Sequence, residues 1–176
     1  MPGIDTSRDF TPVRIAVLTV SDTRTLETDT SGDILAQRVQ DAGHMLAERR
    51  IVKDVPALIR ASVQTWIDDA NIDVVISTGG TGLTGRDVTP EAITPLFEKT
   101  IDGFSVVFHQ VSYQSVGLST LQSRAVAGLA NGTFIFCLPG SNGAVKDGWD
   151  KVISHQLDSR YRPCNLVELM PRLMEQ

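Results

Sequence analysis

The sequence has few of the residues that build a disulfide framework, a zinc site or a membrane span. Its two cysteines, Cys137 and Cys164, are too far apart for a CxxC pair, and its three histidines are scattered without an HExxH pattern, so the common zinc motifs are excluded. Scarce cysteine is typical of a reducing compartment. No apolar run reaches the ~18 residues of a transmembrane helix, and residues 1–12 lack the apolar core of a signal peptide. We therefore expect a cytoplasmic protein without a membrane partner.

Positive charge is also scarce. The chain has 16 Lys and Arg against 21 Asp and Glu, a net charge of −5, whereas general affinity for nucleic acid requires a basic surface. Its 176 residues, 41% of them hydrophobic, are enough to bury the core of one ordinary domain without disulfides. We expect a flexible N-terminal arm over residues 1–12 and a single domain over residues 13–170.

Apolar residues recur in two alternating patterns along the chain. The short apolar runs that predict buried strands are 13–20, 72–77 and, with a weaker pattern, 45–52. The segments with apolar residues at helical spacing are 34–42, 59–70, 93–97, 104–111 and 145–157. Asn131-Gly132 lies between the apolar runs 125–130 and 133–138, which predicts a β-hairpin.

This order of elements predicts an α/β fold. Alternating strands and helices imply a doubly wound, mostly parallel sheet with helices on both faces, to which the hairpin adds a small antiparallel element. In such sheets, ligands bind in loops at the carboxyl ends of the strands. Three loops qualify, at residues 19–23, 78–87 and 138–143, and we expect the binding site between them. Trp66, Trp149 and Cys137 lie on apolar faces or runs, which favours core positions.

Residues 77–92, STGGTGLTGRDVTPEA, form the most informative segment. Consecutive glycines after a strand let the backbone approach a ligand and turn its N–H groups toward an anion. A helix with Thr89 as N-cap and Pro90 at its first position would point its positive end toward the same region. Phosphate binding follows from this pattern. The alternative is a tight glycine turn in which Asp87 caps the helix.

Two better-known phosphate motifs do not fit this loop. Residues 80–85 match GxGxxG, but they follow a later strand and do not open directly into a helix, as a dinucleotide fingerprint does. The P-loop ends in G-K-[ST], whereas this loop has Gly85-Arg86-Asp87, so its lysine and its magnesium-binding hydroxyl are missing.

The segment 77–92 resembles the signature of the MoaB/MogA family of molybdenum cofactor biosynthesis proteins, which also includes the G domain of gephyrin. The other matching stretches are 18–22 (LTVSD), 29–32 (DTSG), 119–127 (STLQSRAVA) and 138–141 (LPGS). The resemblance spans residues 14 to about 166, and segments 117–128 and 156–165 are most similar to MoaB-type members. It implies a doubly wound, molybdopterin-binding domain that assembles into trimers or, in MoaB-type members, hexamers.

The resemblance also implies a chemistry. Active members of the family transfer AMP from ATP to the terminal phosphate of molybdopterin, and the adenylylated product is then used for metal insertion. The implied cofactor is Mg²⁺, the substrates are ATP and molybdopterin, and the implied partners are further copies of the chain and a molybdenum-insertion protein. The alternatives are a non-catalytic molybdopterin-binding or carrier protein of the same pathway and, more distantly, a nicotinamide dinucleotide enzyme.

The family pattern assigns residues to the site. Asp87 matches an acidic residue after the glycine loop and Asp54 a second one after the second strand; we expect both to be catalytic and to bind magnesium, since carboxylates hold this ion. Asp54 as an N-cap of the helix containing Pro56 is an equal alternative. The residues expected to bind the substrates are Ser21, Asp22, Gly79, Gly80, Thr81, Gly82, Ser119, Ser123, Arg124, Pro139, Gly140 and Ser141.

Two groups of residues have competing explanations. Ser123 and Arg124 suit the molybdopterin phosphate, because a guanidinium presents a planar fork of donors, but a helix-end contact or a subunit salt bridge explains them equally well. Asp29, Ser31 and Gly32 could shape the pocket, whereas Asp29 or Ser31 could simply cap a helix.

Overall fold

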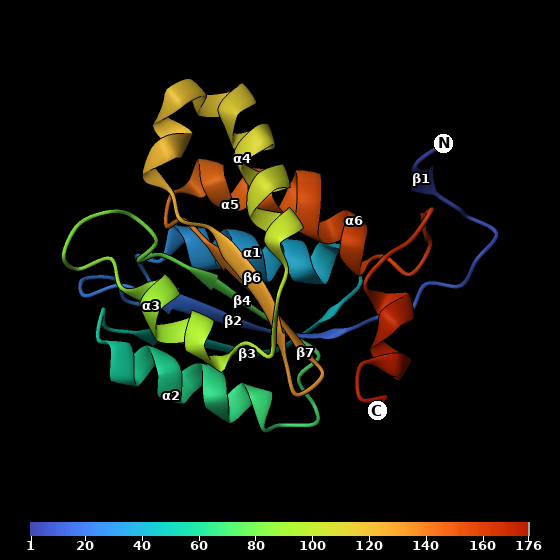
Figure 1. Cartoon of the computed structure of the whole chain (residues 1–176), viewed down its shortest axis with the longest axis horizontal. Coiled ribbons are helices and arrows are strands. Elements are labelled where there is room, and N and C mark those ends of the chain that lie inside the picture. The colour runs from blue at the N-terminus through green and yellow to red at the C-terminus, as the bar shows by residue number, and fades with distance from the viewer. Residues whose placement is uncertain (176) are drawn as a thin grey trace.

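The computed structural model describes residues 1–175, and its centre is one six-stranded sheet (Figure 1). The strands are β2 (Arg14–Val20), β3 (Met45–Val52), β4 (Val74–Thr78), β5 (Lys99–Thr100), β6 (Val126–Ala130) and β7 (Thr133–Leu138). They lie in the order β3-β2-β4-β7-β6-β5. The four strands β3, β2, β4 and β7 are mutually parallel, and β6 runs antiparallel to both its neighbours. The predicted mostly parallel sheet is thereby confirmed.

Helices connect the strands and cover both faces of the sheet. The α-helices are α1 (Thr30–Asp41), α2 (Pro56–Ile67), α3 (Thr89–Ile93), α4 (Asp102–Val116), α5 (Asn142–Gly148) and α6 (Ser154–Leu157). The shorter helices are η1 (Thr94–Leu96), η2 (Gly117–Gln122), η4 (Val167–Arg172) and the π-helical η3 (Trp149–Ile153), which joins α5 to α6. In residues 1–175, no helix is both long and apolar enough to span a membrane.

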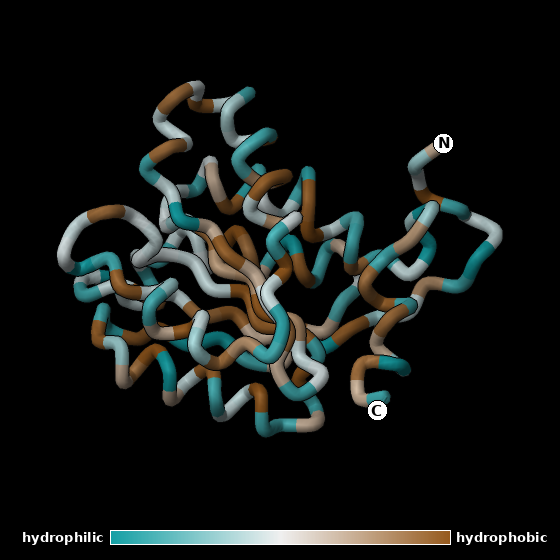
Figure 2. The backbone as a smooth tube through the Cα atoms, in the orientation of Figure 1, coloured by the Kyte–Doolittle hydropathy of each residue, from teal (hydrophilic) through white to brown (hydrophobic). Residues whose placement is uncertain are grey.

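The sheet separates two hydrophobic cores. Ile15 and Val17 of β2 face α1, α4 and the α5–α6 segment, whereas Leu18 faces α2 and α3. This alternation explains why the strands read as continuous apolar runs, since both faces are covered. The brown centre of Figure 2 follows these strands. Trp149 packs in the first core, and Trp66 and Cys137 in the second, as predicted.

The hairpin and the chain termini extend this frame. Asn131 and Gly132 both have positive φ, 46° and 78°, which a two-residue type I′ turn requires, so the predicted hairpin is confirmed. The edge strand β5 was not predicted, because two residues carry no periodicity. Within the expected N-terminal arm, β1 (Gly3–Ile4) pairs with β8 (Tyr161–Arg162), and the Asp5 amide donates to the Arg160 carbonyl at 3.0 Å.

Four expected helix caps have different outcomes. Asp29 caps α1 by accepting the Gly32 amide at 3.0 Å, as one of the alternatives predicted. Asp54 and Asp87 cap no helix: α2 and α3 have Val55 and Val88 at their N-caps, without a side-chain hydrogen bond. The capping alternatives for these two aspartates are therefore wrong, as is the N-cap assignment of Thr89.

Candidate functional site

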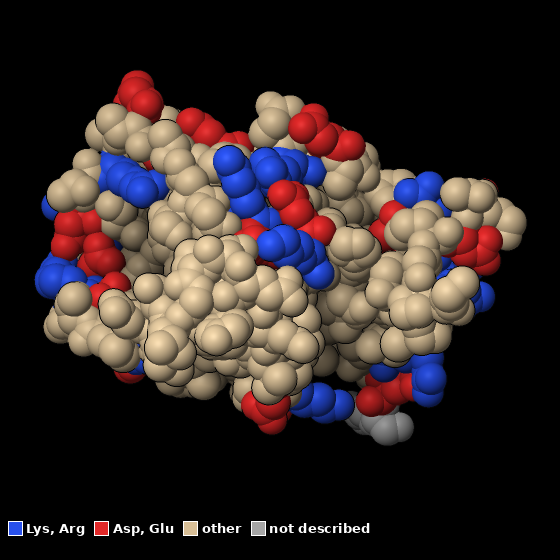
Figure 3. All heavy atoms as spheres, turned by 90° about the horizontal axis from the view of Figure 1, so that it is seen from above, with Lys and Arg blue, Asp and Glu red and all other residues tan. Residues whose placement is uncertain are grey.

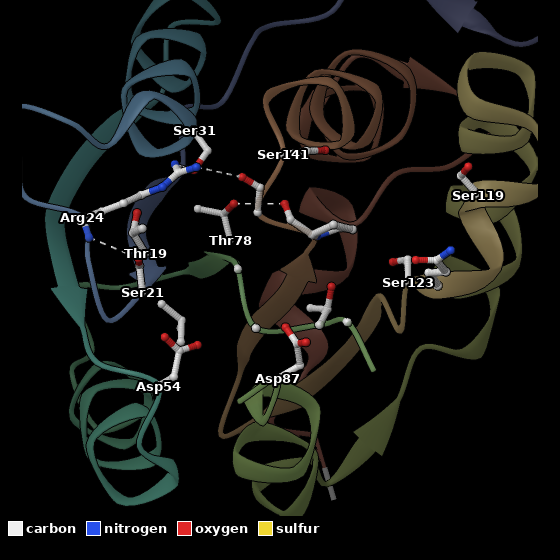
Figure 4. A pocket seen from close by; sticks show the side chains of 18 residues that line it. Thr19, Ser21, Arg24, Ser31, Asp54, Thr78, Asp87, Ser119, Ser123 and Ser141 are labelled. Carbon is white, nitrogen blue, oxygen red and sulfur yellow. Dashed lines mark hydrogen bonds between the residues drawn. The ribbon is translucent and has the colours of Figure 1, made fainter. Parts of the chain in front are cut away.

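The three predicted loops meet at the carboxyl ends of β2, β4 and β7. Thr19 lies opposite Thr78 in the sheet register, Thr78 lies opposite Leu138, and the Gly79 amide donates to the Leu138 carbonyl at 3.0 Å. Between the loops is a pocket of about 560 Å³ (Figure 4). Of the predicted site residues, those that line it are Ser21, Asp54, Gly79, Gly80, Thr81, Gly82, Asp87, Ser119, Ser123, Pro139, Gly140 and Ser141.

The glycine loop forms one wall of this pocket with bare backbone. Gly79 and Gly80 have φ values of 102° and 69°, a region that side chains other than hydrogen rarely allow. A Cβ on Gly79 would come within 2.3 Å of the Val20 carbonyl oxygen. The Thr89 hydroxyl fixes the loop by donating to the Gly79 carbonyl at 2.8 Å. The loop is thus held close to β2 and can present main-chain groups to a ligand.

Asp54 and Asp87 flank the glycine loop. A Cβ on Gly80 would lie 3.4 Å from Asp54 Oδ1, and one on Gly82 would lie 2.7 Å from Asp87 Oδ2. Asp87 Oδ2 accepts the amide and the hydroxyl of Thr84 at 2.9 and 2.6 Å, and these hydrogen bonds lower the pKa of Asp87. Asp87 is therefore an ionised carboxylate with a fixed orientation.

Asp54 is in the opposite electrostatic situation. Partial burial, followed by the nearby carboxylates of Asp22 and Asp87, raises its pKa above the ordinary value. The Asp22 backbone amide and the Arg86 charge oppose this shift without cancelling it, and the amide of Asp54 donates to Asp22 Oδ1 at 3.2 Å. A cation is the group that would stabilise the ionised form here.

The residues at this place fit magnesium. Mg²⁺ commonly takes one or two carboxylates from the protein and completes its octahedral shell with water and substrate phosphate oxygens. Two carboxylates beside an anion-binding loop supply that part of the shell. In the described part of the chain, no three Asp, Glu, His or Cys side chains gather as a closed metal site, so phosphate and water would have to provide the remaining ligands.

The opposite wall carries hydroxyl groups. Ser141 caps α5, its Oγ accepting the Ala144 amide at 3.2 Å. Ser123 lines the pocket, and its Oγ is buried without a hydrogen-bond partner among residues 1–175. A buried hydroxyl without a partner is destabilising and calls for an explanation. A polar ligand group in the pocket would supply the missing partner.

Two predicted site residues do not line the pocket. Asp22 forms an ion pair with Arg86 at 2.5 Å, which links the loop after β2 to the glycine loop. Arg124 is engaged by the glycine loop itself: its Nε donates to the Gly82 carbonyl and its Nη2 to the Asp87 carbonyl, both at 2.8 Å, and Nη1 pairs with Glu91. Since Glu91 lies in the first turn of α3, the structure places Arg124 in a helix-end contact that fixes the loop.

Arg24 lines the pocket and was not predicted. Its Nη1 donates to Ser31 Oγ at 2.7 Å and to Asp29 Oδ1 at 3.3 Å, and Nη2 lies 3.4 Å from the Gly140 carbonyl oxygen. In the sequence it is one polar residue among many in a loop without glycine or apolar periodicity. The available signal was its position, four residues beyond a buried strand whose carboxyl end was expected to carry the site.

The chain is similar to proteins of molybdenum cofactor biosynthesis. Residues 16–159 match the family model described as a probable molybdopterin binding domain. The chain is 51% identical over 159 residues to molybdenum cofactor biosynthesis protein B of Escherichia coli (strain K12), which covers 90% of this chain and 94% of the relative. It is 46% identical over 146 residues to the Bacillus subtilis (strain 168) protein of the same name, covering 82% and 86%.

Solved structures agree with the sequence matches. A crystal structure of a molybdenum cofactor biosynthesis protein B superposes with a TM-score of 0.83 at 40% identity, covering 85% of this chain and 94% of the other. The tungsten cofactor synthesizing protein MoaB from Pyrococcus furiosus superposes with a TM-score of 0.73 at 36% identity, covering 82% and 92%.

Proposed function

The chain belongs to the molybdenum cofactor biosynthesis protein B family, and from this premise we propose that it is a molybdopterin adenylyltransferase. It binds molybdopterin and Mg-ATP between the three loops and transfers AMP to the terminal phosphate of the pterin. The observation that carries the proposal is that two carboxylates, Asp54 and Asp87, line one pocket together with the backbone of residues 79–82. This combination suits a polyphosphate and its magnesium ion.

The reaction needs no protein nucleophile. A phosphate oxygen of molybdopterin forms a bond to the α-phosphorus of ATP, the bond from that phosphorus to the bridging oxygen of the β-phosphate breaks, and pyrophosphate leaves with the electron pair. Negative charge therefore concentrates on the phosphates. Catalysis consists of holding two anions in line and offsetting their charge. Magnesium held by Asp54 and Asp87 would supply Lewis-acid charge neutralisation.

The chain's own residues have separate tasks. The backbone of the glycine loop binds phosphate oxygens, and Thr89 and Arg124 keep the loop in place through their bonds to its carbonyls. Asp87 enters the reaction already ionised, because Thr84 stabilises its charge. Ser123 offers its unpartnered hydroxyl to the phosphate of the pterin.

A direct product assay tests the proposal. The purified protein is incubated with molybdopterin, ATP and magnesium, and adenylylated molybdopterin is sought by chromatography. We expect product with the wild type, and none with Asp87→Asn or when EDTA replaces magnesium. Binding of molybdopterin without any product would contradict the transferase and leave a pterin-binding or carrier protein.

We also propose that the protein works as a homo-oligomer and delivers its product to a metal-insertion protein. An adenylylated pterin is an activated intermediate, so a later enzyme must displace AMP when the metal enters. Exposed apolar side chains on α4 and η2 support self-association. We place all of these steps in the cytoplasm.

A further inference from the structure

The pocket has an uneven charge distribution. Two of its lining side chains are acidic, Asp54 and Asp87, and among the described residues that line it Arg24 is the one basic side chain. Figure 4 shows the two aspartates beside the glycine loop and Arg24 reaching from the loop after β2 toward Ser31. An anionic substrate that fills the pocket meets a cation of the protein at this one place.

The present bonds of Arg24 leave part of its guanidinium unused. A guanidinium has five N–H donors. Nη1 uses two of them on Asp29 and Ser31, and Nη2 uses one on the Gly140 carbonyl at the long distance of 3.4 Å. Nε–H and the second Nη2 hydrogen have no acceptor in residues 1–175. The side chain is 31% exposed, so a ligand can reach it.

Arg24 is also not needed to neutralise Asp29. That carboxylate is fully buried, and it already accepts hydrogen bonds from Thr19 Oγ1 at 2.6 Å, Arg49 Nη2 at 2.9 Å and the Gly32 amide at 3.0 Å. Arg24 approaches the same group only at 3.3 Å. The contact with Asp29 therefore orients the guanidinium along the pocket wall. Much of the positive charge of Arg24 stays available to a ligand.

We propose that Arg24 binds a phosphoryl group of a substrate in this pocket. The inference rests on the proposed function only in taking phosphorylated ligands as the occupants. The same chemistry has two sources, the phosphates of ATP and the phosphate of molybdopterin. Planar, bidentate recognition of phosphate is what a guanidinium does and an ammonium does less well. In binding, the Nη2 hydrogen moves from its long contact with Gly140 to a phosphoryl oxygen.

The test compares affinities for matched ligands. Wild type, Arg24→Gln and Arg24→Lys are titrated by calorimetry with Mg-ATP, adenosine and molybdopterin. Arg38→Gln is the control, because Arg38 makes a comparable ion pair with Asp150, at 2.7 Å, outside the pocket. We expect Arg24→Gln to weaken binding of one phosphorylated ligand ten- to hundred-fold, as loss of a hydrogen bond to a charged group does, with Arg24→Lys intermediate and the control unchanged.

The pattern of losses identifies the source. Weaker ATP binding with unchanged adenosine binding assigns Arg24 to the nucleotide phosphates, and weaker molybdopterin binding alone assigns it to the pterin phosphate. Unchanged affinity for both, an equal loss for adenosine, or a wild type that binds neither phosphorylated ligand overturns the inference. If Arg24→Gln does not fold, Arg24→Lys decides by the same ratio of ATP to adenosine affinity.

Failure of the proposed function is distinguishable from failure of this inference. Product formation by the wild type is measured in parallel. A wild type that makes no adenylylated molybdopterin, together with an Arg24→Gln variant that binds ATP or molybdopterin more weakly, contradicts the transferase and supports the role of Arg24.

Discussion

Asp54 is a single residue whose ionisation is unfavourable in the folded protein. Its carboxylate is partly buried beside Asp22 and Asp87, and these influences outweigh the Asp22 backbone amide and the Arg86 charge that favour its ionised form. Burial and the two neighbouring charges favour its protonated form in the folded protein. At neutral pH, the ionised side chain therefore opposes folding until a cation binds.

The first prediction is that Asp54→Asn stabilises the protein when magnesium is absent. The folded-state pKa of Asp54 lies above the ordinary 3.8, so the penalty is absent below that value and grows as the pH rises through the folded pKa. The gain should be present at pH 7 and vanish below about pH 3.8. Urea denaturation in EDTA measures it, with the exposed Asp9→Asn as control. A variant less stable than the wild type at pH 7 would show that Asp54 is structural.

The second prediction concerns Ser123, whose buried hydroxyl has no partner among residues 1–175. Ser123→Ala should leave the free energy of unfolding unchanged or raise it by up to ~1 kcal/mol, because an unsatisfied hydroxyl is removed. Binding of molybdopterin should weaken about ten-fold if a ligand oxygen is the missing partner.

Thr120 provides the matched control for this experiment. Its Oγ1 is also buried without a partner in the described part of the chain, but Thr120 does not line the pocket. Thr120→Val should therefore leave molybdopterin affinity as it is. Equal effects of the two substitutions on binding would argue that Ser123 acts through packing.

At the scale of elements, the glycine loop lines the pocket and packs against the end of β2. The third prediction is that Gly79→Ala lowers the free energy of unfolding by roughly 1–3 kcal/mol, the usual cost of a strained backbone position, since φ is 102° and the Cβ would lie 2.3 Å from the Val20 carbonyl. Gly85→Ala in the same loop should be nearly neutral, because no atom of the described residues other than its chain neighbours would lie within 4 Å of the added Cβ, and its φ is not positive. Urea denaturation of both variants checks this, and equal losses would mean that the loop is strained throughout.

The element pattern was largely predictable because it depends on local signals. Apolar runs located β2, β3 and β4, and Asn131-Gly132 located the β6–β7 hairpin, since type I′ geometry requires these residue types. The loops of the pocket followed from topology alone. The N-cap assignment of Thr89 and the capping alternatives for Asp54 and Asp87 were wrong although all three are good N-caps by residue type; the Thr89 hydroxyl bonds the Gly79 carbonyl instead.

The side-chain geometry of the site was less accessible. Arg124 has a residue type that suits phosphate binding, but its guanidinium donates to the carbonyls of Gly82 and Asp87. Arg24 joins Ser31 and Gly140, which lie 7 and 116 positions away in the chain. No local sequence pattern encodes the contact with Gly140, so only the folded chain could reveal it.

At the scale of the whole molecule, an apolar surface remains uncovered. Six large hydrophobic side chains of α4 and η2 are exposed: Val106, Val107, Tyr113, Val116, Leu118 and Leu121, with Leu118 and Leu121 each 72% exposed. Figure 3 looks onto the α4 side of the molecule and shows a broad area without charged groups. Large exposed apolar side chains gathered on one helix and the segment that follows it favour an interaction site.

The fourth prediction is that this surface holds copies of the chain together. Leu118→Glu with Leu121→Glu should convert the oligomer to monomers, because each places an ionised carboxylate in an apolar contact. Light scattering after size exclusion measures the change. Leu58→Glu is the control, since Leu58 is 48% exposed on α2 across the sheet.

Ser119 lies on η2 between the two leucines and lines the pocket, so loss of assembly should also weaken molybdopterin binding. A wild type that is monomeric at micromolar concentration would contradict the prediction and leave the apolar surface for a different partner.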